Sequence, residues 1–376
     1  MKNKQPLIIL GIETSCDETA AAVLEYKNNY FRIISNVVSS QIKIHRRYGG
    51  IVPEVAARAH IENILPVIKK ALKTLENKKN RPPTYPPMRR IDLIAVTYGP
   101  GLVTSLLVGL ETAKTISYLW QKPLIDINHL EAHLAANWLL SIGENPKSQI
   151  PNPKSFPAVS LIVSGGHTEL GLIKKMGRYK KIGQTRDDAA GECFDKIAKL
   201  LSLGYPGGPE ISRYAEKFHS KPKTINFKLP RPMINSDDFD FSFSGLKTAV
   251  LYLVKKNKNK IKNENFIKKV CAETQQAIID VLIYKTVKAA KKYRAKTVFL
   301  SGGVAANQEL RNQFNLNLKS KFSNLNFLVP PKNLCTDNAA MVAAAGILKY
   351  NSLTPRQKIK LKNNWQRIKA NPNLNL

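Results

Sequence analysis

The sequence is short of acidic residues, of cysteine and of long apolar runs, and each shortage excludes a class of protein. Its 59 Lys and Arg against 27 Asp and Glu give a net charge of +32. The four cysteines lie far apart without a C-x-x-C pair, so we expect neither a disulfide framework nor a thiolate zinc site. The longest apolar stretch, 102–120, contains Glu111 and Lys114 and therefore indicates a buried helix rather than a membrane span.

What is present is typical of a soluble globular protein of two or three domains. The chain has 376 residues, of which 43% are apolar, and this composition excludes a disordered or collagen-like protein. The apolar run before Glu13 is too short for a signal peptide, so we expect a cytoplasmic protein without a membrane anchor. The positive charge favours polyanions such as nucleic acid, although a lysine-rich compositional bias explains it equally well.

Two predicted β-hairpins suggest a duplicated architecture. Strands over 7–11 and 20–26 enclose one polar turn, and strands over 159–163 and 169–173 enclose a second, about 150 residues later. A further strand over 297–300 leads through Ser301-Gly-Gly into a helix. We expect two α/β lobes, at 1–155 and 156–348, whose turns face each other across a cleft, and a basic tail over 349–376.

Helices and connectors complete the predicted organisation. Apolar spacing predicts helices over the ranges 55–75, 103–119, 129–140, 265–294 and 337–350. Proline-rich segments at Lys78–Arg90 and 145–157 indicate an exposed excursion and an interdomain connector. The lysine run Lys255–Lys269 and the tail from Lys349 either contact a phosphate backbone or are solvated surface.

A pair of histidines has the spacing of metal ligands. His129 and His133 lie four residues apart on a predicted helix, which places both imidazoles on one face. Glu131 points away from that face, so the base of a zinc protease is missing. Asp337 is the best candidate for a third ligand, although an N-cap role also explains it. Such a set suits Fe(II) or Zn(II); the alternative is two solvent-facing histidines.

Glycine turns and an acidic patch are the other candidates for binding. The turns at Ser164-Gly-Gly-His-Thr168 and Ser301-Gly-Gly-Val-Ala-Ala-Asn307 allow a phosphate to approach backbone N–H groups, or are plain turns. Asp187, Asp188, Glu192 and Asp195 suit ribose hydroxyls or an amine, or are acids at a helix start.

Together these motifs resemble one family, the tRNA threonylcarbamoyl-adenosine transferases, once called O-sialoglycoprotein endopeptidases. The resemblance runs from about Leu7 to Tyr350. The motifs that carry it are Gly11-Ile-Glu-Thr-Ser-Cys-Asp-Glu-Thr19, Asn128-His-Leu-Glu-Ala-His133, Val163-Ser-Gly-Gly-His-Thr168, Asp187-Asp-Ala-Ala-Gly-Glu192, Phe241-Ser-Phe-Ser-Gly-Leu-Lys-Thr248 and Ser301-Gly-Gly-Val-Ala-Ala-Asn307.

The resemblance implies a fold, a reaction and a set of site residues. It implies a duplicated actin-like ATPase fold, shared with sugar kinases and heat-shock chaperone ATPases, around a nucleotide cleft. Threonylcarbamoyl-AMP would donate its threonylcarbamoyl group to N6 of the adenosine 3′ of the anticodon, in tRNAs that read codons beginning with A, and AMP would leave. The implied metal ligands are His129, His133 and Asp337. The implied donor-binding residues are Ile162, Val163, Ser164, Gly165, Gly166, Asp195, Gly208 and Asn307.

Further expectations concern the metal, the base and the partners. One divalent ion is expected, with Fe(II) favoured and Zn(II) the alternative. Asp17 or Glu18 is the candidate base for the amine proton. The resemblance also implies tRNA, a paralogous actin-like subunit and a P-loop ATPase as partners. Three rival interpretations are a sugar-kinase-like or chaperone-like ATPase, which leaves the histidine pair unexplained, a metalloprotease, which lacks its base, and a non-catalytic nucleic-acid-binding module.

Overall fold

The computed structural model describes residues 5–75, 87–140, 155–218, 227–260 and 262–376. The chain forms two compact units. The first contains Met1–Lys43, Ile51–Pro153 and Pro330–Leu376, and the second contains Ile44–Gly50 and Lys154–Val329. None of the helices in the described ranges has the length and apolarity needed to cross a bilayer.

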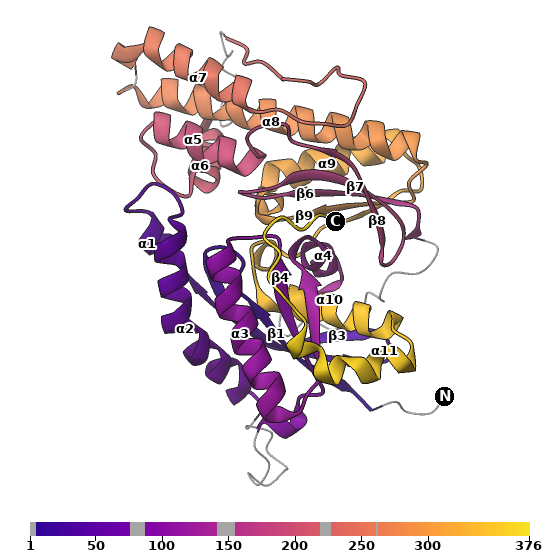
Figure 1. The fold of residues 1–376 in the computed structure, drawn as a ribbon. Helices are drawn as coiled ribbons and strands as arrows, with labels where there is room; N and C mark the ends of the chain where they lie inside the picture. The colour runs from indigo at the N-terminus through magenta and orange to yellow at the C-terminus, as the bar shows by residue number, and fades with distance from the viewer. Residues whose placement is uncertain (1–4, 76–86, 141–154, 219–226, 261) are drawn as a thin grey trace. The chain divides into compact units, whose positions relative to one another are not determined.

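The first unit is built on a five-stranded mixed sheet of order β3-β2-β1-β4-β5. Strand β1 pairs antiparallel with β2 and parallel with β4, which pairs parallel with β5. The carboxyl ends of β1, β4 and β5 therefore meet at one edge of the sheet (Figure 1). The strands are β1 (Leu7–Glu13), β2 (Glu18–Lys27), β3 (Tyr30–Ser40), β4 (Leu93–Gly99) and β5 (Leu124–Asn128).

The second unit repeats this topology. Its sheet has the order β10-β9-β6-β7-β8, with β6–β7–β8 antiparallel and β6–β9–β10 parallel. The predicted duplication is therefore confirmed, and each strand of the first sheet has a counterpart in the second. The strands are β6 (Ala158–Val163), β7 (Thr168–Lys175), β8 (Arg178–Gln184), β9 (Thr297–Ser301) and β10 (Asn326–Leu328).

Helices cover both faces of the first sheet. The apolar side chains of Leu10 and Ile12 share one core cluster with residues of α2 (Pro53–Lys73) and α3 (Val103–Trp120). On the opposite face, Gly11 lies against α10 (Ala339–Ser352), where a Cβ atom would meet the Ala339 carbonyl oxygen at 2.3 Å. Small residues on strand and helix thus allow α10 to pack directly on the centre of the sheet.

The position of α10 changes the predicted lobe boundaries. The sequence predicts one lobe over 156–348, but the structure places residues 330–348 in the first unit. The reason is packing: the alanine-rich α10 is buried over most of its length against the strands of the first sheet. The chain therefore leaves the first unit, forms the second, and returns to complete the first.

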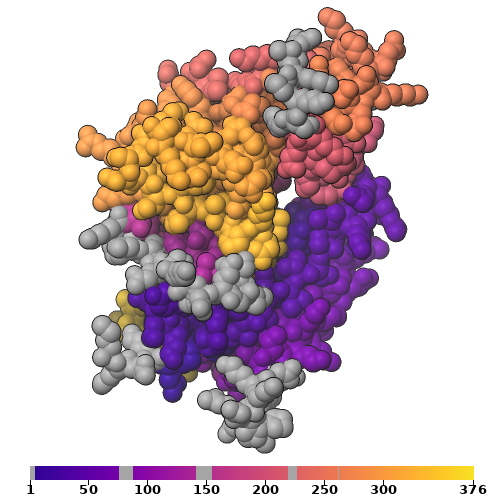
Figure 2. Space-filling model, turned by 180° about the vertical axis from the view of Figure 1, so that it is seen from behind, coloured from indigo at the N-terminus to yellow at the C-terminus, as the bar shows by residue number. Residues whose placement is uncertain are grey.

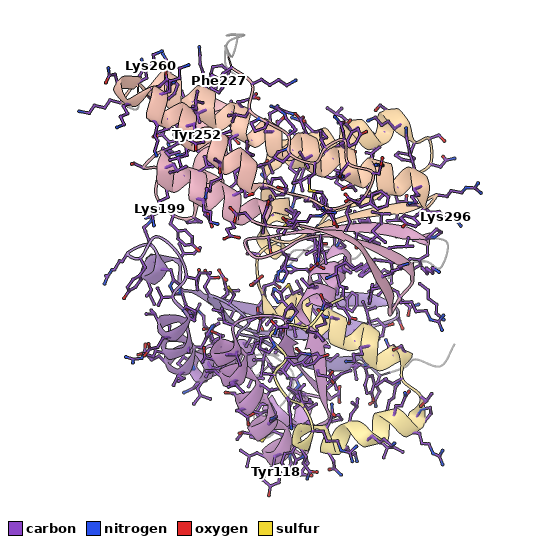
Figure 3. The ribbon with its side chains drawn as sticks, turned by 45° about the horizontal axis from the view of Figure 1, so that its top comes forward. Tyr118, Lys199, Phe227, Tyr252, Lys260 and Lys296 are labelled. Atoms are coloured by element: carbon purple, nitrogen blue, oxygen red, sulfur yellow. The ribbon has the colours of Figure 1, made fainter. Side chains whose placement is uncertain are left out.

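The C-terminal segment is also part of the first unit rather than a basic tail. After α11 (Pro355–Lys360) and the 3-10 turn η7 (Leu361–Gln366), Ile368 is buried in the same core cluster as β1. The Trp365 ring packs on Tyr118 in the last turn of α3, with ring centroids 5.1 Å apart; Tyr118 is labelled in Figure 3. The amide of Asn371 donates to the Tyr98 carbonyl at 2.8 Å.

Among the described residues, helices α5 to α9 belong to the second unit, and the short α1 falls where the chain passes from the first unit to the second. Helix α8 is the long helix that the sequence predicts over 265–294, and α9 lies at the surface of this unit (Figure 2). The bounds are α1 (Ile42–His45), α5 (Ala190–Leu200), α6 (Gly207–Phe218), α7 (Ser244–Lys256), α8 (Glu264–Lys292) and α9 (Gln308–Lys321).

The lysine run Lys255–Lys269 extends from the end of α7 to the first turns of α8. Lys255, Lys256 and Lys260 are exposed there, and Tyr252 on α7 is 65% exposed (Figure 3). A contact with a phosphate backbone stays a prediction. The predicted excursion at Lys78–Arg90 and connector at 145–157 lie largely outside the described residues.

Candidate functional site

Two histidines and an aspartate from distant parts of the sequence meet in the first unit. Helix α4 (His129–Ala135) begins directly after β5, so His129 starts at the carboxyl edge of the sheet. The Nε2 atoms of His129 and His133 lie 3.5 and 3.1 Å from Oδ1 of Asp337. One potential ligand atom from each residue lies within 4.8 Å of the other two. The structure thus brings together the three side chains that the sequence suggests as ligands.

The position of Asp337 excludes one of its two suggested roles. The side chain of Asn338, not that of Asp337, caps α10, since its Oδ1 accepts a hydrogen bond from the Met341 amide at 3.1 Å. The Asp337 carboxylate lies one residue before this cap and faces the histidines. The N-cap explanation of Asp337 is therefore wrong, because its neighbour takes that role.

The donor set fits a divalent cation. His133 is 1% exposed, its Nδ1 has no hydrogen-bond partner among the described residues, and its Nε2 faces the Asp337 carboxylate at 3.1 Å without making a hydrogen bond to it. A buried imidazole in this state is costly unless something else uses its lone pair. Burial lowers the pKa of His129, but the charges of Asp337 and Glu13 outweigh this effect and raise it to about 9. The site therefore stabilises positive charge, which a proton or a metal ion supplies.

A second carboxylate, not proposed from the sequence as a site residue, supports the first histidine. Glu13 is the last residue of β1 and is 0% exposed. Its Oε2 lies 3.2 Å from Nδ1 of His129 and accepts a hydrogen bond from Thr97 Oγ1 at 2.6 Å. Although burial raises it, His129 lowers the pKa of Glu13 below its ordinary value. The sequence signals were its place at the end of an apolar strand and within the motif Gly11–Thr19.

The β1–β2 turn places Asp17 and Glu18 near this cluster. Glu18 is half-buried, and its Oε1 accepts a hydrogen bond from Ser40 Oγ at 3.3 Å. Burial, the adjacent Asp17 and the charge of Asp337 hold the pKa of Glu18 well above its ordinary value. The turn therefore lies within electrostatic reach of the ligand cluster.

A buried histidine, also missed from the sequence, holds this turn. His60 on α2 is 0% exposed. Its Nε2 lies 3.0 Å from the Cys16 carbonyl oxygen, and its Nδ1 lies 2.7 Å from Thr19 Oγ1. Since the carbonyl can only accept, Nε2 carries the proton of the neutral ring and Nδ1 accepts from the hydroxyl. The ring thereby joins the turn and the start of β2 to α2.

The predicted donor-binding residues all lie in the second unit. Ile162 and Val163 end β6, and Ser164, Gly165 and Gly166 form the turn into β7. A Cβ atom added at Gly165 or Gly166 would meet nothing within 4 Å. Packing therefore does not require glycine here, and the open backbone is the kind of surface that a phosphate can approach.

A neighbouring glycine is needed for packing instead. Gly302, after β9, has φ +91°, and its Cβ would meet the Val163 carbonyl oxygen at 2.4 Å. This close approach joins the ends of the parallel strands β6 and β9. The two Ser-Gly-Gly motifs thus differ in whether packing requires their glycines, although their sequences look alike.

The remaining predicted donor residues are linked through α6. Asp195 on α5 accepts a hydrogen bond from the Gly207 amide at 2.6 Å, at the start of α6. Gly208 follows in the first turn of that helix. The Nδ2 of Asn307 donates to Ser212 Oγ on α6 at 2.7 Å. These residues therefore form one connected group, and their contact with a nucleotide stays a prediction.

The acidic patch around Asp187 is explained by contacts within the protein. Asp187 accepts hydrogen bonds from the amide of Phe243 at 2.8 Å and the hydroxyl of Ser244 at 2.7 Å. Although burial raises it, these bonds and one from Ser242 lower the pKa of Asp187. Asp188 and Glu192 both pair with Lys196, at 2.6 and 2.9 Å. These acids hold α5 and the start of α7 in place.

Comparisons with known proteins bear on the family and the fold. Residues 32–344 match the family TsaD, described as tRNA N6-adenosine threonylcarbamoyltransferase. The protein of that name from Thermosipho melanesiensis is 47% identical over 98% of this chain and 100% of its own length. The one from Syntrophomonas wolfei is 46% identical over 93% of this chain and 94% of its own.

A solved structure supports the fold alone. Full-length HypF, in a phosphate- and nucleotide-bound form, is 11% identical with a TM-score of 0.55, and the match covers 93% of this chain. This chain spans 47% of that protein. The likeness agrees with the duplicated actin-like topology of the two sheets.

Proposed function

Because the chain belongs to the tRNA N6-adenosine threonylcarbamoyltransferase family, we propose that it transfers the threonylcarbamoyl group of threonylcarbamoyl-AMP to N6 of the adenosine immediately 3′ of the anticodon. The tRNAs would be those that read codons beginning with A. The observation that carries the proposal is the match of nearly the whole chain to relatives of that name.

The proposed reaction exchanges one acyl bond for another. The adenine N6 attacks the carbamoyl carbon, a C–N bond forms, and the bond from that carbon to the phosphate oxygen of AMP breaks. AMP leaves with the electron pair, and the amine loses a proton to a base. The chain must therefore hold a nucleotide phosphate, polarise a carbamoyl group and accept a proton.

The turn at Ser164–Gly166 would hold the phosphate of the donor. Its two glycines leave the backbone open, and the Ser164 hydroxyl, which accepts a hydrogen bond from the His167 amide at 3.1 Å, lies at the same turn. N–H groups fixed before the reaction stabilise the charge that develops on leaving AMP without reorganising. Asp195, Gly208 and Asn307 would contact the rest of the donor.

His129, His133 and Asp337 would hold one divalent ion, Fe(II) or Zn(II). When bound, such an ion supplies a Lewis acid for the carbamoyl or phosphate oxygen. The protein contributes a buried, preformed set of two imidazoles and one carboxylate within 4.8 Å of one another.

Glu18 is the better of the two candidate bases. A carboxylate with an ordinary pKa is a weak base near neutral pH, whereas burial and the charge of Asp17 raise the pKa of Glu18 well above 4.5. Its proton affinity is thus closer to what removal of an amine proton requires. Asp17 would act through Glu18, because its negative charge raises the proton affinity of the Glu18 carboxylate.

The partners follow from the substrate and the family. A net charge of +32 would attract the tRNA phosphates, with the lysine run Lys255–Lys269 as one candidate contact. We propose a paralogous actin-like subunit and a P-loop ATPase as further partners, acting with this chain in the cytoplasm.

Reconstitution tests the proposal directly. The purified chain, with the partner proteins supplied, is incubated with threonylcarbamoyl-AMP and unmodified tRNA, and the tRNA nucleosides are analysed by mass spectrometry. We expect threonylcarbamoyladenosine at the position 3′ of the anticodon and one AMP per modified nucleoside. The absence of the modified nucleoside in this complete mixture would show that the proposed reaction is wrong.

A further inference from the structure

Glu13 occupies a position that only the folded sheet explains. It ends β1, the central strand, with 0% of its surface exposed. Burying an isolated carboxylate is costly unless hydrogen bonds or opposite charges compensate. Its partners in the structure therefore indicate why an acid is placed there.

Those partners come from the ends of all three parallel strands. The Ser15 amide, just after β1, donates to Glu13 Oε1 at 2.6 Å. The Thr97 hydroxyl of β4 donates to Oε2 at 2.6 Å, and His129 Nδ1, just after β5, lies 3.2 Å from the same oxygen. The carboxylate thus spans the edge of the sheet and reaches the first ring of the ligand cluster.

This arrangement determines which nitrogen of His129 can bind a metal. An ionised carboxylate only accepts hydrogen bonds, so Nδ1 must carry the proton that it shares with Glu13. In the neutral ring, Nε2 then has its lone pair, and Nε2 is the atom that faces Asp337 at 3.5 Å. A carboxylate that accepts a hydrogen bond from the non-ligating nitrogen of a metal-bound histidine fixes the orientation of the ring and raises the basicity of the ligating nitrogen.

We propose that Glu13 is a positioning residue that holds His129 in the orientation and tautomer needed to bind a divalent cation through Nε2. The inference rests on the metal site of the proposed function. His133 has no equivalent support, since its Nδ1 makes no hydrogen bond to a described residue. Glu13 therefore acts on one histidine of the pair.

Ser15 is the competing candidate for this role. Its Oγ also lies 3.2 Å from Nδ1 of His129, so a hydroxyl could accept the same proton. A hydroxyl is a weaker acceptor than a carboxylate, and we therefore expect Ser15 to contribute less. Substitution of each residue separates the two.

The experiment measures the affinity of the metal-free full-length protein for Co(II), without tRNA or donor. Affinity comes from competition with a chromophoric chelator, and the d–d spectrum reports the ligand set. We expect Glu13→Gln to weaken Co(II) binding by about 10- to 100-fold and to alter the spectrum. The Co(II) affinity of Ser15→Ala should stay within about threefold of wild type. The same holds for Glu169→Gln, which makes the same change at a buried glutamate of the second unit.

A double substitution tests whether Glu13 acts through His129. In a His129→Ala background, adding Glu13→Gln should change the Co(II) affinity by less than about twofold, because the ring that Glu13 orients is gone. A full further loss in that background would overturn the inference. If Glu13→Gln does not fold, Glu13→Asp, which keeps the charge but is one methylene too short, replaces it in both measurements.

The outcomes distinguish this inference from the proposed function. Unchanged Co(II) affinity in Glu13→Gln, or an equal or larger loss in Ser15→Ala, would overturn the role of Glu13 and leave the metal site and the reaction standing. If the wild-type protein itself does not bind Co(II), the proposed metal site fails and this inference fails with it. Transfer to tRNA is measured separately and does not enter either result.

Discussion

The two sheets of this protein share one topology but differ in what stands at their strand ends. In the first sheet, β1 ends in the buried Glu13 and β5 leads directly into His129. In the second, the equivalent strand β6 ends in Val163 and an open glycine turn. The same framework thus presents acids and imidazoles in one unit and bare backbone in the other, so the strand ends rather than the topology determine the chemistry.

The units also differ in how the chain completes them. The second is nearly continuous in sequence, whereas the first needs residues 330–376. That returning segment supplies both Asp337 and the buried helix α10. In the first unit, the ligand cluster and the fold therefore depend on the same late part of the chain.

The largest expected effect comes from removing Asp337, the potential metal ligand on the segment that returns to the first unit. Asp337→Ala should abolish stoichiometric metal binding and lower tRNA modification by at least about 100-fold, since even an outer partner of a ligand typically costs 10- to 100-fold. Metal analysis and mass spectrometry of tRNA nucleosides measure the two effects. Asp237→Ala, an exposed acid of the second unit, is the matched control. If Asp337→Ala binds no metal and still modifies tRNA fully, the reaction does not need the ligand cluster of the first unit. The proposed chemical difference between the two units would then be wrong.

The next effect tests whether the C-terminal segment is core. Ile368 is 6% exposed and belongs to the core cluster of the first unit. Ile368→Ala should lower the free energy of unfolding by about 2–4 kcal/mol, through lost burial and a new cavity. Ile359→Ala, 70% exposed on the same segment, should change it by less than about 0.5 kcal/mol. Urea unfolding measures both, and equal values would mean that the segment does not contribute to the core.

Two glycines sharpen the contrast between a packed strand and an open turn. Gly11→Ala places a Cβ atom 2.3 Å from the Ala339 carbonyl oxygen and should destabilise the protein by about 1–3 kcal/mol. Gly165→Ala meets no atom within 4 Å and should leave stability within about 0.5 kcal/mol. If the turn holds the donor phosphate, Gly165→Ala should instead raise KM for threonylcarbamoyl-AMP by about tenfold. An unchanged KM would count against that turn as the donor site.

The smallest effect concerns the acidic turn of the first unit. The raised pKa of Glu18 means that the folded protein binds more protons than the unfolded chain as pH rises above 4.5, so this group lowers stability with rising pH. Glu18→Gln should therefore raise the urea midpoint relative to wild type at pH 8 but not at pH 4.

An exposed glutamate provides the control for that measurement. Glu62→Gln makes the same chemical change on the exposed surface of α2 and should show no such dependence on pH. A Glu18→Gln variant less stable than wild type at pH 8 would mean that its carboxylate is favourably paired, and the proposed base would lose its support.

The sequence predicted most of the regular structure because local patterns carry it. The apolar spacing indicated α2, α3, α8 and α10 within a few residues of their observed ends, and two hairpins about 150 residues apart indicated the duplication. Strands β3, β4, β8 and β10 were not predicted from the sequence. Of these, β8 has the polar sequence Arg178-Tyr-Lys-Lys-Ile-Gly-Gln184 and lies largely outside the core. It forms a strand because it pairs with β7, not because of its own composition.

By itself, the sequence determined the family, the helix that carries His129 and His133, and Asp337 as the third side chain, because each belongs to a short motif that keeps its spacing along the chain. Only the tertiary structure decided that residues 330–376 complete the first unit and that Glu13, Thr97 and His129 meet. Three parallel strands far apart in the sequence end at one edge of a sheet, and no local pattern encodes which of their terminal side chains will touch. That contact depends on strand order, which long-range packing determines.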